Sequence, residues 1–267
     1  MLIARCKAVG HLKFKAMDLN NRSLKGMGLA ATLGAIAVGL YVVPAKAQMH
    51  GGSPHHSPGS HQSPANTDHL SALDANEASA QRLFNEGLEK LQAADDQGAI
   101  ESFGKAIALS PRHEDAYINR GNVYRKLGNY QGALADYTRA LQLNPSFTYL
   151  HNSRGNVREA LQDYKGAIAD YTEAIRLYPE ASAGYRNLGS VHSKLGDYQA
   201  ALKSLNQAVQ VNSGSAASYL KRGEIYLKLD DPKKAMDDFR QAAELFSSQG
   251  NVEDSQTANR LLQELQK

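Results

Sequence analysis

The sequence predicts an all-α fold, a solenoid of five helical hairpins followed by one capping helix. Two observations predict it. From residue 80 onward the chain repeats with a period of 34 residues, and small residues recur at fixed positions in every repeat. A single hairpin of this length cannot bury its apolar face, so repeated hairpins are expected to stack. An apolar leader and a polar linker precede the repeats.

The leader contains an uncharged apolar segment, residues 26–43, which follows Lys25. Small residues placed as in an A-x-A cleavage site come directly after it and end at Ala47. We interpret residues 1–47 as a signal peptide and expect export to a periplasmic or equivalent lumenal compartment. The alternative is an uncleaved membrane anchor that holds the repeats outside the cytoplasm, since 18 apolar residues can just span a bilayer. Met17 is an alternative start of translation.

Residues 48–79 are the predicted linker. Its first part, residues 48–69, is rich in Gly, Ser, Pro and His, and no large apolar residue follows Met49 there. Burial cannot offset the entropy of ordering such a segment, so we expect it to be flexible. Its histidines fit either a polar spacer or a weak copper or zinc site. These histidines are His50, His55, His56, His61 and His69.

The repeats fill residues 80–249, and each has glycine at its eighth position and a large apolar residue at its twenty-fourth. The five repeats are residues 80–113, 114–147, 148–181, 182–215 and 216–249. The glycines are Gly87, Gly121, Gly155, Gly189 and Gly223, and the large residues are Phe103, Tyr137, Tyr171, Leu205 and Phe239. Alanine holds the twentieth and twenty-seventh positions throughout. Small residues let two antiparallel helices approach closely, and the large residue fills the space beside them.

Residues 250–267 are expected to form the capping helix. Ala258, Leu261, Leu262 and Leu265 fall on one face of a helix there. That face would cover the open end of the last hairpin.

The period and the recurring positions resemble the tetratricopeptide-repeat (TPR) family over residues 80–249. The resemblance implies a right-handed α-solenoid whose first helices line a concave groove for another protein or a peptide. It also implies which first-helix positions face that groove. The candidate groove residues are Asn85, Asn119, Asn122, Arg125, Lys126, Asn152, Asn156, Arg186, Asn187, Ser190, Lys194 and Lys221.

The asparagines among these candidates leave two interpretations open. An amide side chain both donates and accepts hydrogen bonds, so a row of amides can hold an extended peptide. The same residues also make an ordinary polar helix surface. The basic candidates favour an acidic segment or a terminal carboxylate as the ligand. At the N-terminal end, Phe84, Leu88 and Leu91 are expected to form an apolar pocket.

Arginine at the seventh position of a repeat occurs together with aspartate at the twenty-third. The pairs are Arg120/Asp136, Arg154/Asp170 and Arg222/Asp238, whereas repeats one and four have Glu86/Ser102 and Leu188/Ser204. We therefore predict an ion pair between the two helices of repeats two, three and five. Such pairs fix geometry more reliably than they add stability.

Composition and motifs exclude several classes of function. Residues 80–267 carry 23 basic and 23 acidic residues, so no positive surplus serves a nucleic acid. Cys6, in the leader, is the only cysteine, which excludes structural disulfides from a processed chain. No catalytic motif is present, so we expect neither an enzyme nor a cofactor. We expect an exported protein-interaction scaffold; the alternative is a metal-handling protein that uses the histidine-rich linker. The sequence leaves the oligomeric state open.

Overall fold

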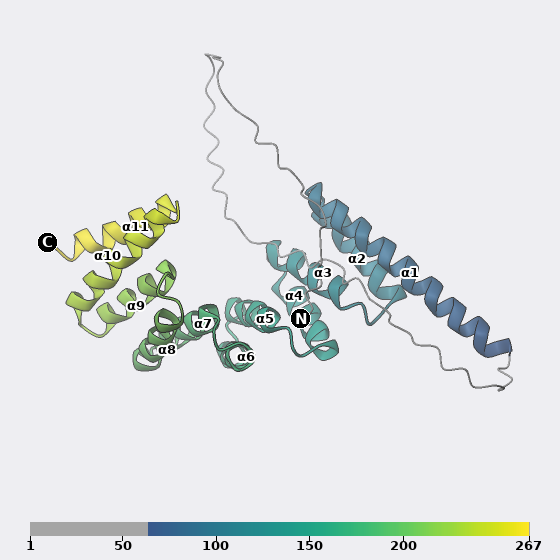
Figure 1. Cartoon of the computed structure of the whole chain (residues 1–267), viewed down its shortest axis with the longest axis horizontal. Coiled ribbons are helices and arrows are strands. Elements are labelled where there is room, and N and C mark those ends of the chain that lie inside the picture. Colours follow the sequence, from purple (N-terminus) through teal and green to yellow (C-terminus); the bar gives the residue numbers. More distant parts are fainter. Residues whose placement is uncertain (1–63, 267) are drawn as a thin grey trace, which may run out of the picture. The chain divides into compact units, whose positions relative to one another are not determined.

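A computed structural model describes residues 64–266, with side chains described from residue 74 onward. Regular structure within residues 64–266 is entirely helical, which confirms the predicted all-α class (Figure 1). The helices are α1 (Pro64–Gln92), α2 (Asp96–Leu109), α3 (Glu114–Lys126), α4 (Tyr130–Leu143), α5 (Thr148–Ala160), α6 (Tyr164–Leu177), α7 (Ser182–Lys194), α8 (Tyr198–Val211), α9 (Ala216–Lys228), α10 (Pro232–Ser248) and α11 (Val252–Glu264).

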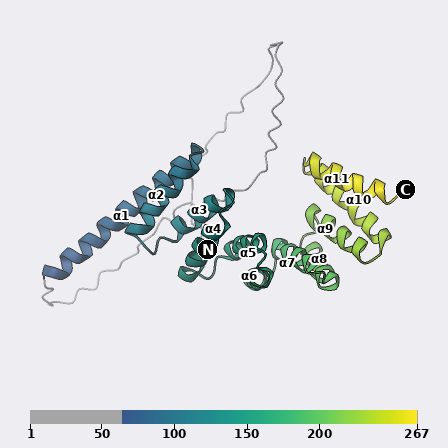
Figure 2. The same cartoon turned by 180° about the vertical axis from the view of Figure 1, so that it is seen from behind.

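Consecutive helices pair into hairpins that stack in chain order. The pairs α1–α2, α3–α4, α5–α6, α7–α8 and α9–α10 lie side by side in both views (Figures 1 and 2). The second helix of each hairpin also packs on the first helix of the next hairpin, and α5 contacts α7 as α7 contacts α9. Four first helices begin at the first positions of repeats in the sequence: Glu114, Thr148, Ser182 and Ala216.

The eighth-position glycines lie against the large side chains of the same repeats. A Cβ atom added at Gly155 would lie 2.6 Å from the Tyr171 ring, and one added at Gly189 would lie 2.7 Å from Leu205. Both distances are too short for real carbon atoms, so the two helices of a hairpin need glycine to reach this separation. The large residues themselves are buried at all five repeats. The expected pairing of small with large residues is confirmed.

The turn inside each hairpin combines a positive φ angle with a helix cap. Gly128, at φ +75°, ends the first helix of repeat two, and Asn129 then caps α4 by accepting a hydrogen bond from the Gly132 amide. Aspartates cap the second helices of the other four repeats in the same way. Such caps satisfy backbone N–H groups that the first helical turn leaves unpaired.

The three predicted Arg–Asp pairs form. Arg120 Nε and Nη2 donate to the two Asp136 oxygens at 2.8 and 2.7 Å, a bidentate arrangement. The same bidentate geometry joins the other pairs, Arg154–Asp170 and Arg222–Asp238. All three aspartates are buried. These arginines therefore join the two helices of each of the three hairpins.

The first helix begins earlier than the sequence predicts. The helix α1 starts at Pro64 and so covers residues 64–79, which the sequence assigned to the linker. Pro64 is the only proline of α1 and stands at its first position, where proline needs no N–H partner. Alanine, leucine and glutamate in residues 71–79 favour a helix. His69 lies in this helix.

Several sequence predictions concern residues outside the described part of the chain. The leader, residues 1–47, and four of the five linker histidines (His50, His55, His56 and His61) lie there. Within residues 64–266, no helix is long and apolar enough to cross a membrane. Among the side chains described from residue 74 onward, no cluster of His, Cys, Asp and Glu is suited to a metal ion.

The helix α11 packs on the last hairpin. Ala258 is fully buried against α10 together with Ala243 and Phe246. Ser255 Oγ donates a hydrogen bond to the Ala243 carbonyl at 3.0 Å. The predicted capping helix thus covers the apolar end of repeat five.

Candidate functional site

The first helices α5, α7 and α9 contact one another in order and share a polar surface. We call this surface the first-helix face. We define it by the side chains of Asn156, Glu159, Arg186, Asn187, Ser190, Lys194, Lys221 and Glu224. Six of these eight were candidate groove residues in the sequence. Glu159 and Glu224 were not, and the structure adds them.

A hydrogen-bonded network centred on Tyr171 joins α5 to α7. The Tyr171 hydroxyl lies 2.7 Å from Asn156 Oδ1 and 2.9 Å from Glu159 Oε2, and shares its one hydrogen between these acceptors. Burial and the neighbouring Glu159 charge raise the pKa of Tyr171 far above its ordinary value, so the phenol stays protonated. Glu159 in turn accepts from Ser190 Oγ at 3.5 Å and pairs with Lys194 at 2.9 Å. Glu159 thereby links both helices.

Two of the predicted asparagines pair with each other. Asn187 Nδ2 donates to Asn156 Oδ1 across the α5–α7 contact at 3.1 Å. Asn156 is exposed and Asn187 half-buried. This amide pair keeps one carbonyl oxygen and further N–H groups at the surface, which are the groups that a peptide backbone pairs with.

All three lysines of the predicted site have carboxylate partners. Lys126 pairs with Asp96 at 2.7 Å, Lys194 with Glu159 at 2.9 Å and Lys221 with Glu224 at 2.9 Å. These pairs reduce the positive charge that the sequence predicted for this face.

Arg125 and Arg186 differ from the lysines, because no ion pair among the side chains described from residue 74 onward includes either of them. Both are half-buried. Burial lowers the pKa of Arg186, which is near the Tyr171 hydroxyl, but an arginine keeps its charge at neutral pH. Arg125 Nε is enclosed without a hydrogen-bond acceptor. A partly desolvated guanidinium without an anion is a strong anion-binding group.

Two of the predicted asparagines are buried and do not reach the exposed surface of the first helices. Asn119 is 1% exposed and donates to the Asp115 carbonyl of its own helix. Asn122 is 8% exposed, and its Oδ1 accepts from the Tyr137 hydroxyl at 2.7 Å. The prediction that both contact a peptide is wrong, because hairpin packing covers them. Asn85 is exposed on α1, away from the first-helix face as defined.

Asn152 is half-buried on α5, and its Oδ1 atom is enclosed without a hydrogen-bond donor. A Cβ atom at Gly184 would lie 3.7 Å from that oxygen, which places it against the start of α7. Asn152 therefore points into the contact between the two helices.

The apolar pocket expected at the N-terminal end is also wrong. Phe84 is fully buried, and its ring packs against Phe103 at 5.6 Å and His113 at 4.8 Å between centroids. Leu88 and Leu91 are partly buried against the same cluster. These residues form the core of the first hairpin.

A small pocket of about 110 Å³ opens between α7 and α9. Leu205 of α8 and Ile225 of α9, both buried, supply its apolar surface. Polar side chains and one glycine line the remainder: Gly189, Ser190, Ser193, Lys194, Lys221 and Glu224. We call it the α7–α9 pocket. The sequence carried a signal for it, since repeat four has Leu and Ser where repeats two and three have Tyr and Asn.

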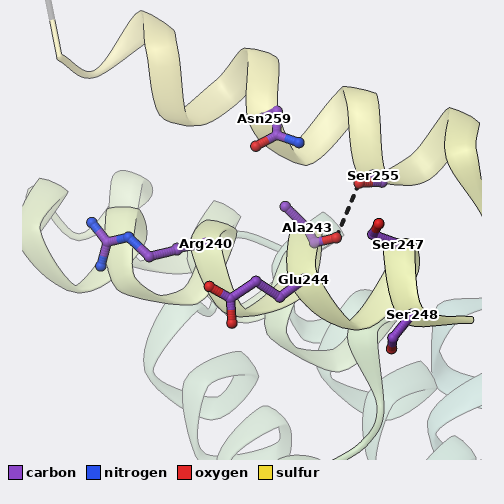
Figure 3. Close-up of a pocket in the computed structure, with 7 residues that line it drawn as sticks. All are labelled: Arg240, Ala243, Glu244, Ser247, Ser248, Ser255 and Asn259. Atoms are coloured by element: carbon purple, nitrogen blue, oxygen red, sulfur yellow. Dashed lines mark hydrogen bonds between the residues drawn. The ribbon is translucent and has the colours of Figure 1, made fainter.

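A wider groove runs along the contact between α10 and α11 and is lined by side chains of both helices (Figure 3). Arg240, Glu244 and Ser247 come from α10, and Ser255 and Asn259 come from α11. The hydrogen bond from Ser255 to the Ala243 carbonyl crosses it, and Arg240 pairs with Asp237 on its own helix. We interpret this groove as the packing joint of the capping helix.

Stacked antiparallel hairpins with a shared first-helix face define an α-solenoid, a class of helical repeat proteins. Two tetratricopeptide-repeat family models match the chain, one at residues 114–147 and the other at residues 145–213 and 183–248. The matches together extend over half of the chain. The chain belongs to the tetratricopeptide-repeat family.

Solved structures share this fold. MamA from Desulfovibrio magneticus superposes with a TM-score of 0.60 at 20% identity, covering 64% of this chain and 97% of that one. YrrB, a TPR protein with an unusual peptide-binding site, gives 0.57 at 20% identity over 72% of this chain and 97% of its own. An uncharacterized protein of Methanocaldococcus jannaschii is 36% identical over 58 residues, which is 22% of this chain and 67% of that protein.

Proposed function

We propose that the chain is an exported scaffold that binds an extended, acidic segment of another protein on the first-helix face. Arg186 carries the proposal. Arg186 is half-buried, and no carboxylate among the side chains described from residue 74 onward pairs with it. A carboxylate from a ligand would meet two parallel N–H donors there, in a setting where water competes weakly.

The amide pair beside Arg186 suits the backbone of such a segment. Asn156 and Asn187 lie on adjacent first helices and bond to each other, which fixes their orientation. Their remaining donors and acceptors can pair with a peptide backbone whatever its side chains. YrrB, whose fold this chain shares, is described by its peptide-binding site, which supports a peptide ligand here. Binding, not catalysis, is the proposed activity.

Export rests on the leader alone. Residues 26–43 are uncharged and mostly apolar, and Ala45 and Ala47 follow them as in an A-x-A cleavage site. Mass spectrometry of the protein from its own cells tests this part of the proposal. We expect a mature chain that begins at Gln48; recovery of the intact leader in the cytoplasmic fraction would overturn export.

The binding experiment compares the full chain with Arg186→Gln and with Arg176→Gln as its matched control. Arg176 is an exposed arginine that pairs with Glu173 on α6, the second helix of its hairpin. The control therefore makes the same change of charge away from the first-helix face. Partners are cross-linked in the native compartment and quantified by mass spectrometry. We expect partners that Arg186→Gln loses and Arg176→Gln retains, with circular dichroism showing that both variants fold.

Two outcomes contradict the proposed function. If Arg186→Gln retains the same partners as the unmodified chain, the ligand does not use this face. If Arg176→Gln loses them equally, the effect is one of net charge and not of the site.

A further inference from the structure

Repeat four differs from repeats two and three at the ninth and twenty-fourth positions of the repeat. In repeats two and three, a tyrosine of the second helix donates to an asparagine of the first, at 2.7 Å in both Tyr137–Asn122 and Tyr171–Asn156. Repeat four has Leu205 and Ser190 at these places. Leucine lacks the outer part of the tyrosine ring and its hydroxyl, and serine is shorter than asparagine.

The α7–α9 pocket lies where those atoms are missing. Ser190 and Leu205 both line it, and its volume is about 110 Å³. A dry cavity of about 150 Å³ accommodates benzene. The α7–α9 pocket therefore suits a side chain of valine or leucine size, and the buried Leu205 and Ile225 provide the apolar contact.

Arg186 and the pocket lie along one helix. Ser190 follows Arg186 by four residues on α7 and Ser193 by seven, so the three share a face. Four residues of helix span about 6 Å. Alternate side chains of an extended peptide are separated by about 7 Å and point the same way. One extended peptide can therefore place one side chain at Arg186 and the side chain two residues away in the pocket.

We propose that the α7–α9 pocket selects a branched aliphatic residue two positions from the acidic residue that Arg186 binds. This proposal rests on the proposed function and names the class of its ligand: an extended peptide with an acidic–X–aliphatic pattern. Lys194 and Lys221 at the pocket rim pair with Glu159 and Glu224, so the rim is neutral and does not repel an apolar side chain.

Repeats two and three show which residues would fill the pocket. Ser190→Asn together with Leu205→Tyr gives repeat four the residues of repeats two and three. Gly189 faces Leu205 at the repeat position where Gly155 faces the larger Tyr171 ring. The tyrosine should therefore be accommodated without loss of folding.

The test measures fluorescence anisotropy of labelled peptides with the full chain. The peptides carry Asp-Gly-Leu, Asp-Gly-Ser or Asn-Gly-Leu within one glycine–serine context. We expect the chain to bind Asp-Gly-Leu at least about tenfold more tightly than Asp-Gly-Ser, the minimum that burial of a leucine side chain provides. The pocket-filled variant should bind these two equally and still prefer Asp to Asn. Arg186→Gln should lose the Asp preference and keep the Leu preference.

Each contrary result has a distinct meaning. Equal binding of Asp-Gly-Leu and Asp-Gly-Ser to the unmodified chain overturns the pocket proposal without needing any variant. If Arg186→Gln still loses native partners in that case, the proposed function stands. The pocket proposal is also wrong if the pocket-filled variant still binds Asp-Gly-Leu more tightly than Asp-Gly-Ser. If only the pocket-filled variant changes its sedimentation coefficient, the pocket is part of a contact between two copies of the chain. That result would overturn the proposal that the pocket binds a peptide.

Discussion

Replacing Asp136 by serine tests the strength of the buried Arg–Asp pairs. Asp136 is 4% exposed and accepts two hydrogen bonds from Arg120, whose side chain keeps 21% of its accessible area. Removing one partner of a fully buried pair costs about 3–5 kcal/mol. Because Arg120 keeps some solvent contact and lies over the Tyr117 and Tyr124 rings, we expect Asp136→Ser to lower the free energy of unfolding by about 2–3 kcal/mol.

The double variant Arg120→Leu/Asp136→Ser measures the interaction between the two side chains apart from the separate contribution of each. It gives repeat two the residues that repeat four has naturally, Leu188 and Ser204. No charge is then left without a partner, so the double variant should be more stable than Asp136→Ser alone. The expected coupling free energy is about 1–2 kcal/mol.

Urea unfolding followed by circular dichroism at neutral pH measures all three variants. Asp237→Ser is the control, because Asp237 pairs with Arg240 at 3.2 Å on the exposed side of α10 and should cause no measurable change. A double variant less stable than Asp136→Ser would refute the reasoning. It would mean that Arg120 stabilises the chain through its other contacts and not through the carboxylate.

Three further predictions use the same unfolding measurement. Gly155→Ala should destabilise by about 1–3 kcal/mol, since its methyl group would lie 2.6 Å from the Tyr171 ring; no loss would show that α5 and α6 separate freely. Tyr137→Phe leaves Asn122 without its donor and should cost about 1 kcal/mol, and an unchanged stability would contradict that hydrogen bond. Burial alone would raise the pKa of Asp170, but hydrogen bonds from His151 and Arg154, with the charges of Arg154 and Arg158, hold that pKa below its ordinary value. Asp170 should therefore contribute full stability above about pH 4, lost as pH falls through the folded-state pKa, and Asp170→Asn should flatten this acid limb.

The fold could be predicted from the sequence because its signals are local and repeated five times. Gly155 and Tyr171 are sixteen positions apart, and the same spacing recurs in each repeat. A spacing that recurs identifies which residues of two helices face each other. The arginine and aspartate of the buried pairs were found by the same reasoning, since they appear and disappear together.

The start of α1 at Pro64 was missed because composition, not periodicity, was used to assign residues 64–79 to the linker. Those residues precede the first repeat and carry no repeat signal. Helix propensity in residues 71–79 favours a helix instead, and Glu77 accepts a hydrogen bond from Ser110, which follows α2, at 3.1 Å.

The sequence by itself determined the repeat, its helices and the pairs that join them, because these depend on neighbours at fixed separations. Only the tertiary structure decided which polar residues reach the surface. Asn122 and Asn156 hold the same repeat position and bond to equivalent tyrosines, yet Asn122 is buried and Asn156 is exposed. How far a residue is covered depends on how adjacent hairpins stack, which the repeat pattern does not determine. The same holds for Arg186, which has no carboxylate partner among the side chains from residue 74 onward. The α7–α9 pocket differs from both, because Leu205 and Ser190 already mark it in the sequence.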